Sequence, residues 1–183
     1  MSATPSRTQP GGPPGVLVGL DDDPHSGRLG AMDETTPATP ETLRSVDLTR
    51  IGATRYKATN ARGGVLPIGS GDDPDFSPVE LLLAAIAGCG AIDVDLITGK
   101  RAQPEHFEVR AEGHKVRDEK GNHLVGLRVT FDVRFPEGEA GDRAREALPR
   151  SVQQSRDRLC TVGRTVALGE PIDYVVGEAS TPR

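Results

Sequence analysis

The sequence predicts an α+β domain in which antiparallel strands pack against helices. Two observations support this class. The predicted elements lack the regular strand–helix–strand alternation of a parallel sheet. Two long segments also alternate apolar and polar residues with a period of two, which indicates strands with one buried face. The first elements expected are strands at 46–58 and 64–69, joined by a turn-rich stretch at 60–64.

A helix is predicted to start next, at Ser77. This serine suits the N-cap position, Pro78 the first helical position, and Glu80 the third, where its carboxylate closes a capping box. The helix should run to Ile97. Residues 81–92 are apolar on every side of it, which indicates a buried helix, and we expect this stretch to be too short to span a bilayer.

The remaining elements follow in order. The alternating strands begin at Phe107 and Leu127, with a hairpin turn at 118–122 between them. A helix is expected at 140–158, kinked or divided at Pro149, and a short helix at 161–168. A last strand at 172–176 should complete the fold.

The folded domain is expected to cover residues 45–178, between a disordered tail at 1–44 and a C-terminal tail at 179–183. Prolines and glycines crowd the first segment, and no aromatic residue precedes Tyr56. Met32 could be a second translation start, which would make residues 1–31 dispensable; a natural flexible tail is the alternative.

Composition argues against several classes of function. The formal net charge is −5, with acids and bases spread along the chain, so neither nucleic acid nor an anionic membrane is an expected partner. The short apolar run at 16–18 is no signal peptide, so the expected location is cytoplasmic. There, two cysteines are better explained as reactive thiols than as a disulfide scaffold.

Those cysteines are Cys89, within the apolar helix between Gly88 and Gly90, and Cys160, at the start of the short helix. Two glycines inside a helix suggest that a backbone or a ligand approaches closely. At a helix start, backbone N–H groups together with Arg158 and Arg164 should stabilise a thiolate. Two thiols on separate elements suffice for peroxide reduction through a sulfenic acid and a disulfide. Two inert core cysteines are the alternative.

Two segments resemble motifs of the OsmC/Ohr family, the osmotically inducible and organic-hydroperoxide-resistance proteins. They are Ser77 to Cys89 with Asp93-Val94 after it, and Leu159-Cys160-Thr161-Val162 downstream. The resemblance covers residues 46–177 and is closest to the OsmC-like branch. It implies an intertwined homodimer with strands wrapped around central helices.

The resemblance also implies a thiol-dependent peroxidase that acts on organic hydroperoxides and is reduced by a cellular dithiol, without metal or cofactor. Cys89 would attack the peroxide and Cys160 would resolve the sulfenic acid. Arg62 best matches the family's thiolate-binding arginine, although a solvated turn arginine is the alternative. Val79 stands where the peroxidases of the family place a glutamate. The next residue, Glu80, does not replace that glutamate, because the capping box already explains it.

The other candidates are weaker. His106, His114 and His123 show no carboxylate–histidine spacing of a known metal site and are expected at the surface or in turns. Asp93 lies on the same helical face as Cys89 and has no predicted role. The alternative function is a weakly catalytic or non-catalytic protein that binds a hydrophobic small molecule in a pocket around Cys89.

Overall fold

The computed structural model describes residues 42–177. The chain divides between Leu43 and Arg44, and every helix and strand described belongs to the second unit. Met32 and the predicted tails, apart from residues 42–44, lie outside the described residues. The boundaries of the folded domain therefore stay a prediction.

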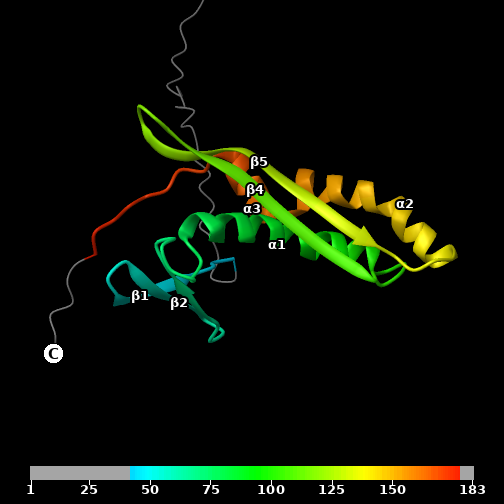
Figure 1. Cartoon of the computed structure of the whole chain (residues 1–183), viewed down its shortest axis with the longest axis horizontal. Helices are drawn as coiled ribbons and strands as arrows, with labels where there is room; N and C mark the ends of the chain where they lie inside the picture. The colour runs from blue at the N-terminus through cyan, green and yellow to red at the C-terminus, as the bar shows by residue number, and fades with distance from the viewer. Residues whose placement is uncertain (1–41, 178–183) are drawn as a thin grey trace, which may run out of the picture. The chain divides into compact units, whose positions relative to one another are not determined.

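The fold is α+β with two antiparallel sheets, as predicted (Figure 1). In chain order the elements are β1 (Val46–Gly52), β2 (Arg55–Asn60), β3 (Val65–Ile68), α1 (Pro78–Thr98), β4 (His106–Asp118), β5 (Gly121–Arg134), α2 (Glu139–Gln154), the π-helix η1 (Ser155–Leu159) and α3 (Thr161–Leu168).

The first sheet has the order β1-β2-β3 and contains one strand more than predicted. The expected strand 46–58 is wrong, because the chain turns back after Gly52 and residues 55–60 pair with β1. Thr54 takes a positive φ of 55° in this turn, a conformation that β-branched residues rarely adopt. The predicted turn at 60–64 is present. There the Asn60 side-chain oxygen accepts hydrogen bonds from the backbone N–H groups of Arg62 and Gly64.

Helix α1 begins with the predicted capping box. The Ser77 hydroxyl oxygen accepts a hydrogen bond from the Glu80 backbone N–H at 3.3 Å, and the Glu80 carboxylate accepts one from the Ser77 N–H at 2.8 Å. Pro78 occupies the first helical position, where its missing N–H costs no hydrogen bond. The local prediction of this helix start is confirmed.

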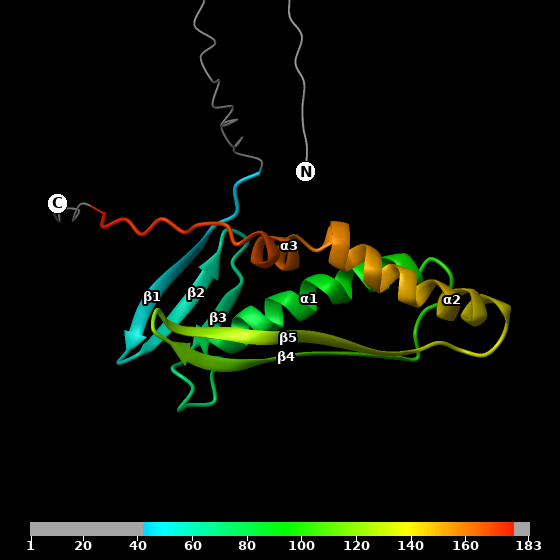
Figure 2. The ribbon, with the colours of Figure 1, turned by 90° about the horizontal axis from the view of Figure 1, so that it is seen from above.

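Helix α1 lies between the β4–β5 hairpin on one side and α2 with α3 on the other (Figure 2). Its own chain covers it only in part, however, since the buried residues along its length are Gly90, Val94 and Thr98. It has 21 residues and ends one residue beyond the predicted Ile97. By length and composition alone it is the one helix among residues 42–177 that could cross a membrane, so the prediction that it is too short is wrong. Core helices meet the same criterion.

The second sheet is the β4–β5 hairpin, in which the predicted alternation is confirmed. Phe107 and Val109 on β4, and Phe131 on β5, are partly buried on the face toward α1, whereas Glu108 and Asp132 are exposed on the other face. The Asp118 side-chain oxygen accepts hydrogen bonds from two backbone N–H groups, those of residues 120 and 121, and so closes the predicted turn.

The C-terminal part departs from prediction twice. Helix α2 continues through Pro149, so this proline does not divide it, and the helix passes into the π-helix η1 before Cys160. The strand expected at 172–176 is wrong. These residues form no strand, and Tyr174 is 91% exposed, because no described strand of this chain lies alongside to pair with them.

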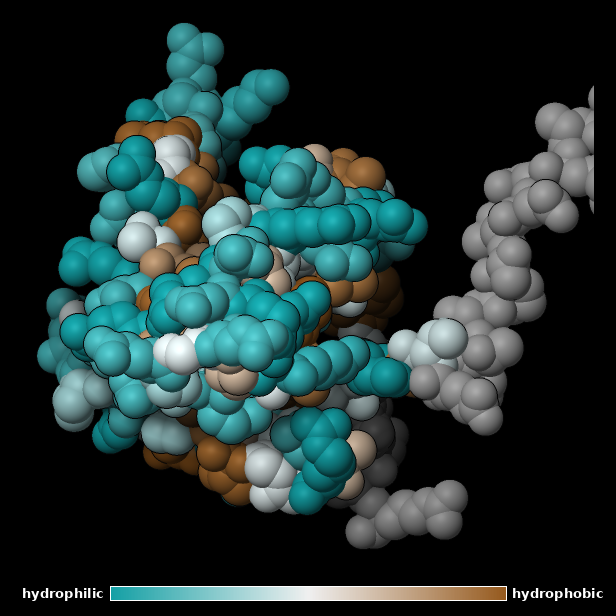
Figure 3. All heavy atoms as spheres, turned by 90° about the vertical axis from the view of Figure 1, so that its right-hand side faces the viewer, coloured by the Kyte–Doolittle hydropathy of each residue, from teal (hydrophilic) through white to brown (hydrophobic). Residues whose placement is uncertain are grey.

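Large apolar side chains remain exposed on several parts of the molecule. Seen from the side where α2 begins, the surface is mostly hydrophilic, with apolar patches between polar groups (Figure 3). The first sheet and α1 carry one set of exposed apolar residues: Val46, Leu48, Ile51, Tyr56, Val65, Leu66, Leu82, Ile92 and Leu96. The C-terminal segment carries another: Leu159, Val166, Leu168, Ile172, Tyr174, Val175 and Val176. The core of the single chain is correspondingly small.

Candidate functional site

The fold brings Cys89 and Cys160 together. Cys89 lies in the middle of α1 and is half-buried, while Cys160 lies between η1 and α3 and is 5% exposed. The Cys89 thiol is near enough to Cys160 to raise the pKa of the Cys160 thiol, and both thiols are free. Two thiols far apart in the sequence are thus neighbours, and proximity is the first requirement for a disulfide.

Cys160 is the N-cap residue of α3. Its sulfur accepts a hydrogen bond from the Gly163 backbone N–H at 3.2 Å. Burial nevertheless raises the pKa of the Cys160 thiol, the adjacent Cys89 thiol and the Asp93 carboxylate raise it further, and only the Gly163 N–H lowers it. The expected backbone N–H of the helix start is present and does lower the pKa, but burial outweighs it, and neither Arg158 nor Arg164 contributes to the shift. The side chain of Arg164 instead donates to the Asp157 carbonyl oxygen at 3.0 Å.

Two residues without a predicted role, Asp93 and Ser155, connect the elements that hold the cysteines. The Ser155 hydroxyl donates a hydrogen bond to the Asp93 carboxylate at 2.9 Å. Ser155 is 3% exposed, and its carbonyl oxygen accepts the Cys160 N–H at 2.9 Å. The pattern of α1 places Asp93 on the face of Cys89, but no local signal reveals that Ser155 reaches it.

A cavity of about 320 Å³ opens beside Cys160, between α1, β5 and the C-terminal helices. Arg156 is the one charged side chain among the residues that line it, and Cys89 is not among them. The lining is otherwise mostly apolar: Ile86, Gly90, Leu127, Val129, Phe131, Val152, Ser155, Cys160, Gly163, Val166 and Ala167. Such a lining suits an organic group that carries little charge.

The two predicted glycines behave differently. A Cβ atom on Gly90 would lie 3.3 Å from Cζ of Phe131, so a side chain approaches closely there, and not the backbone or ligand that was predicted. A Cβ atom on Gly88 would meet nothing within 4 Å among the described residues. No contact within residues 42–177 therefore explains why position 88 is a glycine.

Arg62 is exposed in the turn between β2 and β3. Among residues 42–177, no hydrogen bond or ion pair joins its guanidinium to Cys89 or Cys160, and it does not line the cavity beside Cys160. Val79 is half-buried in the first turn of α1, and Glu80 is engaged in the capping box. A single chain thus leaves the predicted arginine apart from the two thiols.

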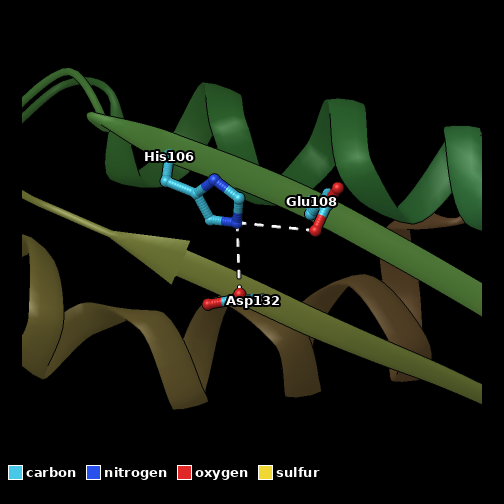
Figure 4. A group of neighbouring side chains, drawn as sticks. All are labelled: His106, Glu108 and Asp132. Carbon is cyan, nitrogen blue, oxygen red and sulfur yellow. Dashed lines mark hydrogen bonds and ion pairs between the residues drawn. The ribbon is translucent and has the colours of Figure 1, made fainter.

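A group of side chains with metal-ligand chemistry lies on the outer face of the β4–β5 hairpin. His106 Nε2 is 3.1 Å from Asp132 Oδ2 and 3.6 Å from Glu108 Oε2 (Figure 4). Their ligand atoms all lie within 4.8 Å of one another, so three donors could hold a divalent cation. Adjacent strands produce this group, which the sequence spacing alone did not indicate. The ion pairs of His106 already account for the arrangement, because both carboxylates are exposed.

The fold and the site together define a class of protein. It is an α+β protein in which Cys89, on a long apolar helix, lies beside Cys160 at the start of a C-terminal helix. A family model described as OsmC-like protein matches residues 69–175, which is more than half of the chain. The chain belongs to the OsmC-like family. The match includes both cysteines and begins after the first sheet, which contains Arg62.

Solved structures agree with this fold. An OsmC-like protein of unknown function from Vibrio cholerae matches with a TM-score of 0.57 at 14% identity, over 68% of this chain and 93% of that chain. A hypothetical protein from Aquifex aeolicus VF5 matches with a TM-score of 0.56 at 19% identity, over 69% and 88%. An OsmC-like protein from Mycoplasma pneumoniae matches with a TM-score of 0.55 at 12% identity, over 69% and 89%. Among curated proteins, none matches this chain.

Proposed function

We propose that this protein is a thiol-dependent peroxidase that reduces organic hydroperoxides. The observation that supports the proposal most is the meeting of Cys89 and Cys160, from two separate elements, beside a mostly apolar cavity. Two thiols in contact can complete a redox cycle without a metal or another cofactor. Membership of the OsmC-like family supports the same reading.

The proposed cycle has three steps. The Cys89 thiolate attacks one peroxide oxygen, the O–O bond breaks, and the alcohol leaves after the alkoxide takes up a proton. The sulfenic acid formed on Cys89 then condenses with the Cys160 thiol, which yields a disulfide and one water molecule. A cellular dithiol finally reduces this disulfide by thiol–disulfide exchange and is itself oxidised to a disulfide.

The environments of the cysteines support this division of roles. The raised pKa of Cys160 keeps its sulfur protonated at neutral pH, where it is a poor nucleophile toward peroxide. Cys89 is the more exposed of the two. The cavity beside Cys160, whose lining includes one charged side chain, that of Arg156, would accept the organic part of the substrate.

Arg62 is proposed as the residue that holds the Cys89 thiolate, through a second copy of the chain. The exposed apolar residues of the first sheet and of α1 support a homodimer, because they need a cover that the single chain does not supply. In such a dimer the turn with Arg62 could reach the thiols of the partner. The proposed location is cytoplasmic, where dithiol reductants keep cysteines reduced.

Substitution of each cysteine tests the proposal. Cys89→Ser should abolish consumption of cumene hydroperoxide, because a serine hydroxyl does not ionise at neutral pH. Cys160→Ser should react once and stall with a sulfenic acid on Cys89, which dimedone traps for mass spectrometry. Wild-type protein with one equivalent of peroxide should contain a Cys89–Cys160 disulfide.

Two outcomes would contradict the proposal. If dimedone labels Cys160 and not Cys89, then Cys160 is the thiol that attacks the peroxide. This outcome has to be tested because Cys160, and not Cys89, lines the cavity. Two thiols inert to hydroperoxide in the folded protein would favour the second candidate, a protein that binds a hydrophobic small molecule. The apolar lining beside Cys160 is the observation that supports this candidate.

A further inference from the structure

Ser155 and Asp93 form a buried polar contact that the proposed reaction cycle does not use. The hydroxyl of Ser155 in η1 donates to the carboxylate of Asp93 in α1 at 2.9 Å, across 62 positions of sequence. Ser155 is 3% exposed, and Asp93 is half-buried. A hydrogen bond to a carboxylate in such surroundings is stronger than one between neutral groups and costs more to break.

Each partner of this hydrogen bond is tied to one cysteine. Asp93 follows Cys89 by four residues and therefore lies one turn further along the same face of α1. Ser155 accepts the Cys160 N–H on its own carbonyl oxygen at 2.9 Å, the wide i to i+5 bond of a π-turn. The position of Ser155 thus determines where the chain places Cys160.

Gly90 permits the close contact between α1 and this turn. A Cβ atom built on Gly90 would lie 3.8 Å from the Ser155 hydroxyl oxygen and 3.3 Å from Phe131. The distance to Ser155 is ordinary van der Waals contact, whereas the distance to Phe131 is tight, so a side chain at this position would press on β5. With glycine here, α1 packs closely against Phe131 and stays within contact distance of Ser155.

We infer that the Asp93–Ser155 hydrogen bond is a latch that holds the π-turn, and with it Cys160, against Cys89. The two residues are positioning residues: they touch neither peroxide nor the reacting oxygen. Their effect is on the effective concentration of one thiol toward the other, and hence on how readily the disulfide forms. The inference rests on the proposed pairing of the two cysteines, but not on peroxide as the oxidant.

Equilibration of the full-length protein with mixtures of reduced and oxidised dithiothreitol measures this effective concentration. Acid quenching, alkylation and mass spectrometry give the fraction of Cys89–Cys160 disulfide at each ratio. Ser155→Ala and Asp93→Ala should each lower the effective concentration by roughly tenfold, as expected for the loss of one charged hydrogen bond. The double variant should lose no more than either single variant, because both remove the same contact.

Conservative variants separate a latch from general damage. Ser155→Thr keeps the hydroxyl and should restore most of the loss. Asp93→Asn keeps an acceptor oxygen without the charge and should restore only part of it. Ser151→Ala is the matched control. Ser151 is also buried, at 1% exposure, but its hydroxyl donates to the Ala147 carbonyl oxygen within α2 and, among the described residues, to neither cysteine-bearing element. It should leave the effective concentration at the wild-type value.

Folded variants of Ser155 and Asp93 with the wild-type effective concentration would overturn the latch, and so would equal losses in Ser151→Ala. If the alanine variants are too unstable to measure, Asp93→Asn is compared with wild type: a partial loss is expected, and a wild-type effective concentration counts against the latch. A wild-type protein that forms the disulfide with dithiothreitol but ignores hydroperoxide would refute the proposed function and leave the latch standing.

Discussion

At the scale of single residues, Cys89 and Cys160 differ in burial and in what surrounds the sulfur. Cys160 is almost fully buried, and burial is the largest cause of its raised pKa. The backbone N–H of Gly163 opposes this effect without overcoming it. A group whose folded pKa is raised stabilises the fold while it is protonated, and this contribution is lost as the pH rises through the folded value.

Alkylation measures this difference directly. At pH 7, iodoacetamide should modify Cys160 much more slowly than in the unfolded chain, because burial and the raised pKa keep the sulfur a protonated, covered thiol. The rate should climb only above the ordinary thiol pKa of 9.0. Peptide mass spectrometry after timed alkylation at pH 7 and above pH 9 gives both rates. Equal rates in folded and unfolded protein at pH 7 would contradict the assigned environment.

Arg62 provides a second test at this scale. Arg62→Ala should lower the rate of hydroperoxide consumption by tenfold or more if its guanidinium holds the thiolate, since a charged hydrogen bond is lost. Val79→Glu should raise the rate, because a carboxylate would orient the guanidinium. Arg117→Ala, at the exposed end of strand β4, is the control and should leave the rate unchanged. An unchanged rate in Arg62→Ala would remove Arg62 from the site.

The sequence predicted the two cysteines but not what holds them together. Cys89 and Cys160 stand out by their local context, a glycine-flanked helix and a helix start. The contact between Ser155 and Asp93 depends on how α2 and η1 fold back along α1, which no local pattern encodes. The sign of the Cys160 pKa shift was missed for the same reason, because burial is a property of the fold.

At the scale of elements, the start of α1 is stabilised by its own sequence. Glu80 has a lowered pKa because the Ser77 hydroxyl and then the Ser77 backbone N–H hydrogen-bond its carboxylate. A lowered folded pKa gives a contribution to stability that is present above the ordinary value of 4.5 and is lost as the pH falls through the folded value.

Ser77→Ala tests the capping box. The variant should lose about 1 kcal/mol in the free energy of unfolding at pH 7, as N-cap substitutions do. The difference from wild type should shrink as the pH falls through the lowered folded pKa of Glu80. Urea denaturation at pH 7 and over a series of acidic pH values measures it, with Ser70→Ala in the exposed loop before α1 as the control. A loss that stays the same as the pH falls would show that Glu80 does not take part.

The elements that the sequence mispredicted lack a local signal or a local partner. The first strand looked continuous from 46 to 58, since Thr54 adopts a positive φ without the glycine that usually marks such a turn. The stretch 172–176 has a strand-like composition, but nothing in the described chain lies beside it to pair with it. The capping box and the β4–β5 hairpin were predicted because neighbouring residues alone determine them.

At the scale of the whole molecule, the single chain leaves most of α1 uncovered. Only 17% of its most apolar window is buried within the chain, although the mean hydropathy of that window is 1.9. The first sheet adds further exposed apolar side chains. A second copy of the chain would cover both surfaces, and it would also explain a glycine at position 88, which faces open space in one chain.

We therefore expect a homodimer, and Gly88 tests its interface. Light scattering at low micromolar concentration should give a particle of twice the 19.4 kDa chain mass. In an uncovered helix, Gly88→Ala would stabilise the protein by up to about 1 kcal/mol, because alanine favours the helix. If a second chain packs closely at this position, the added methyl group should instead lower the melting temperature and shift the equilibrium toward monomer.

Gly90→Ala is the matched control. Its Cβ would meet Phe131 of its own chain, so it should lower stability without a change in the dissociation constant. A 19.4 kDa particle, or a Gly88→Ala variant more stable than wild type and still dimeric, would contradict an interface at this position of α1.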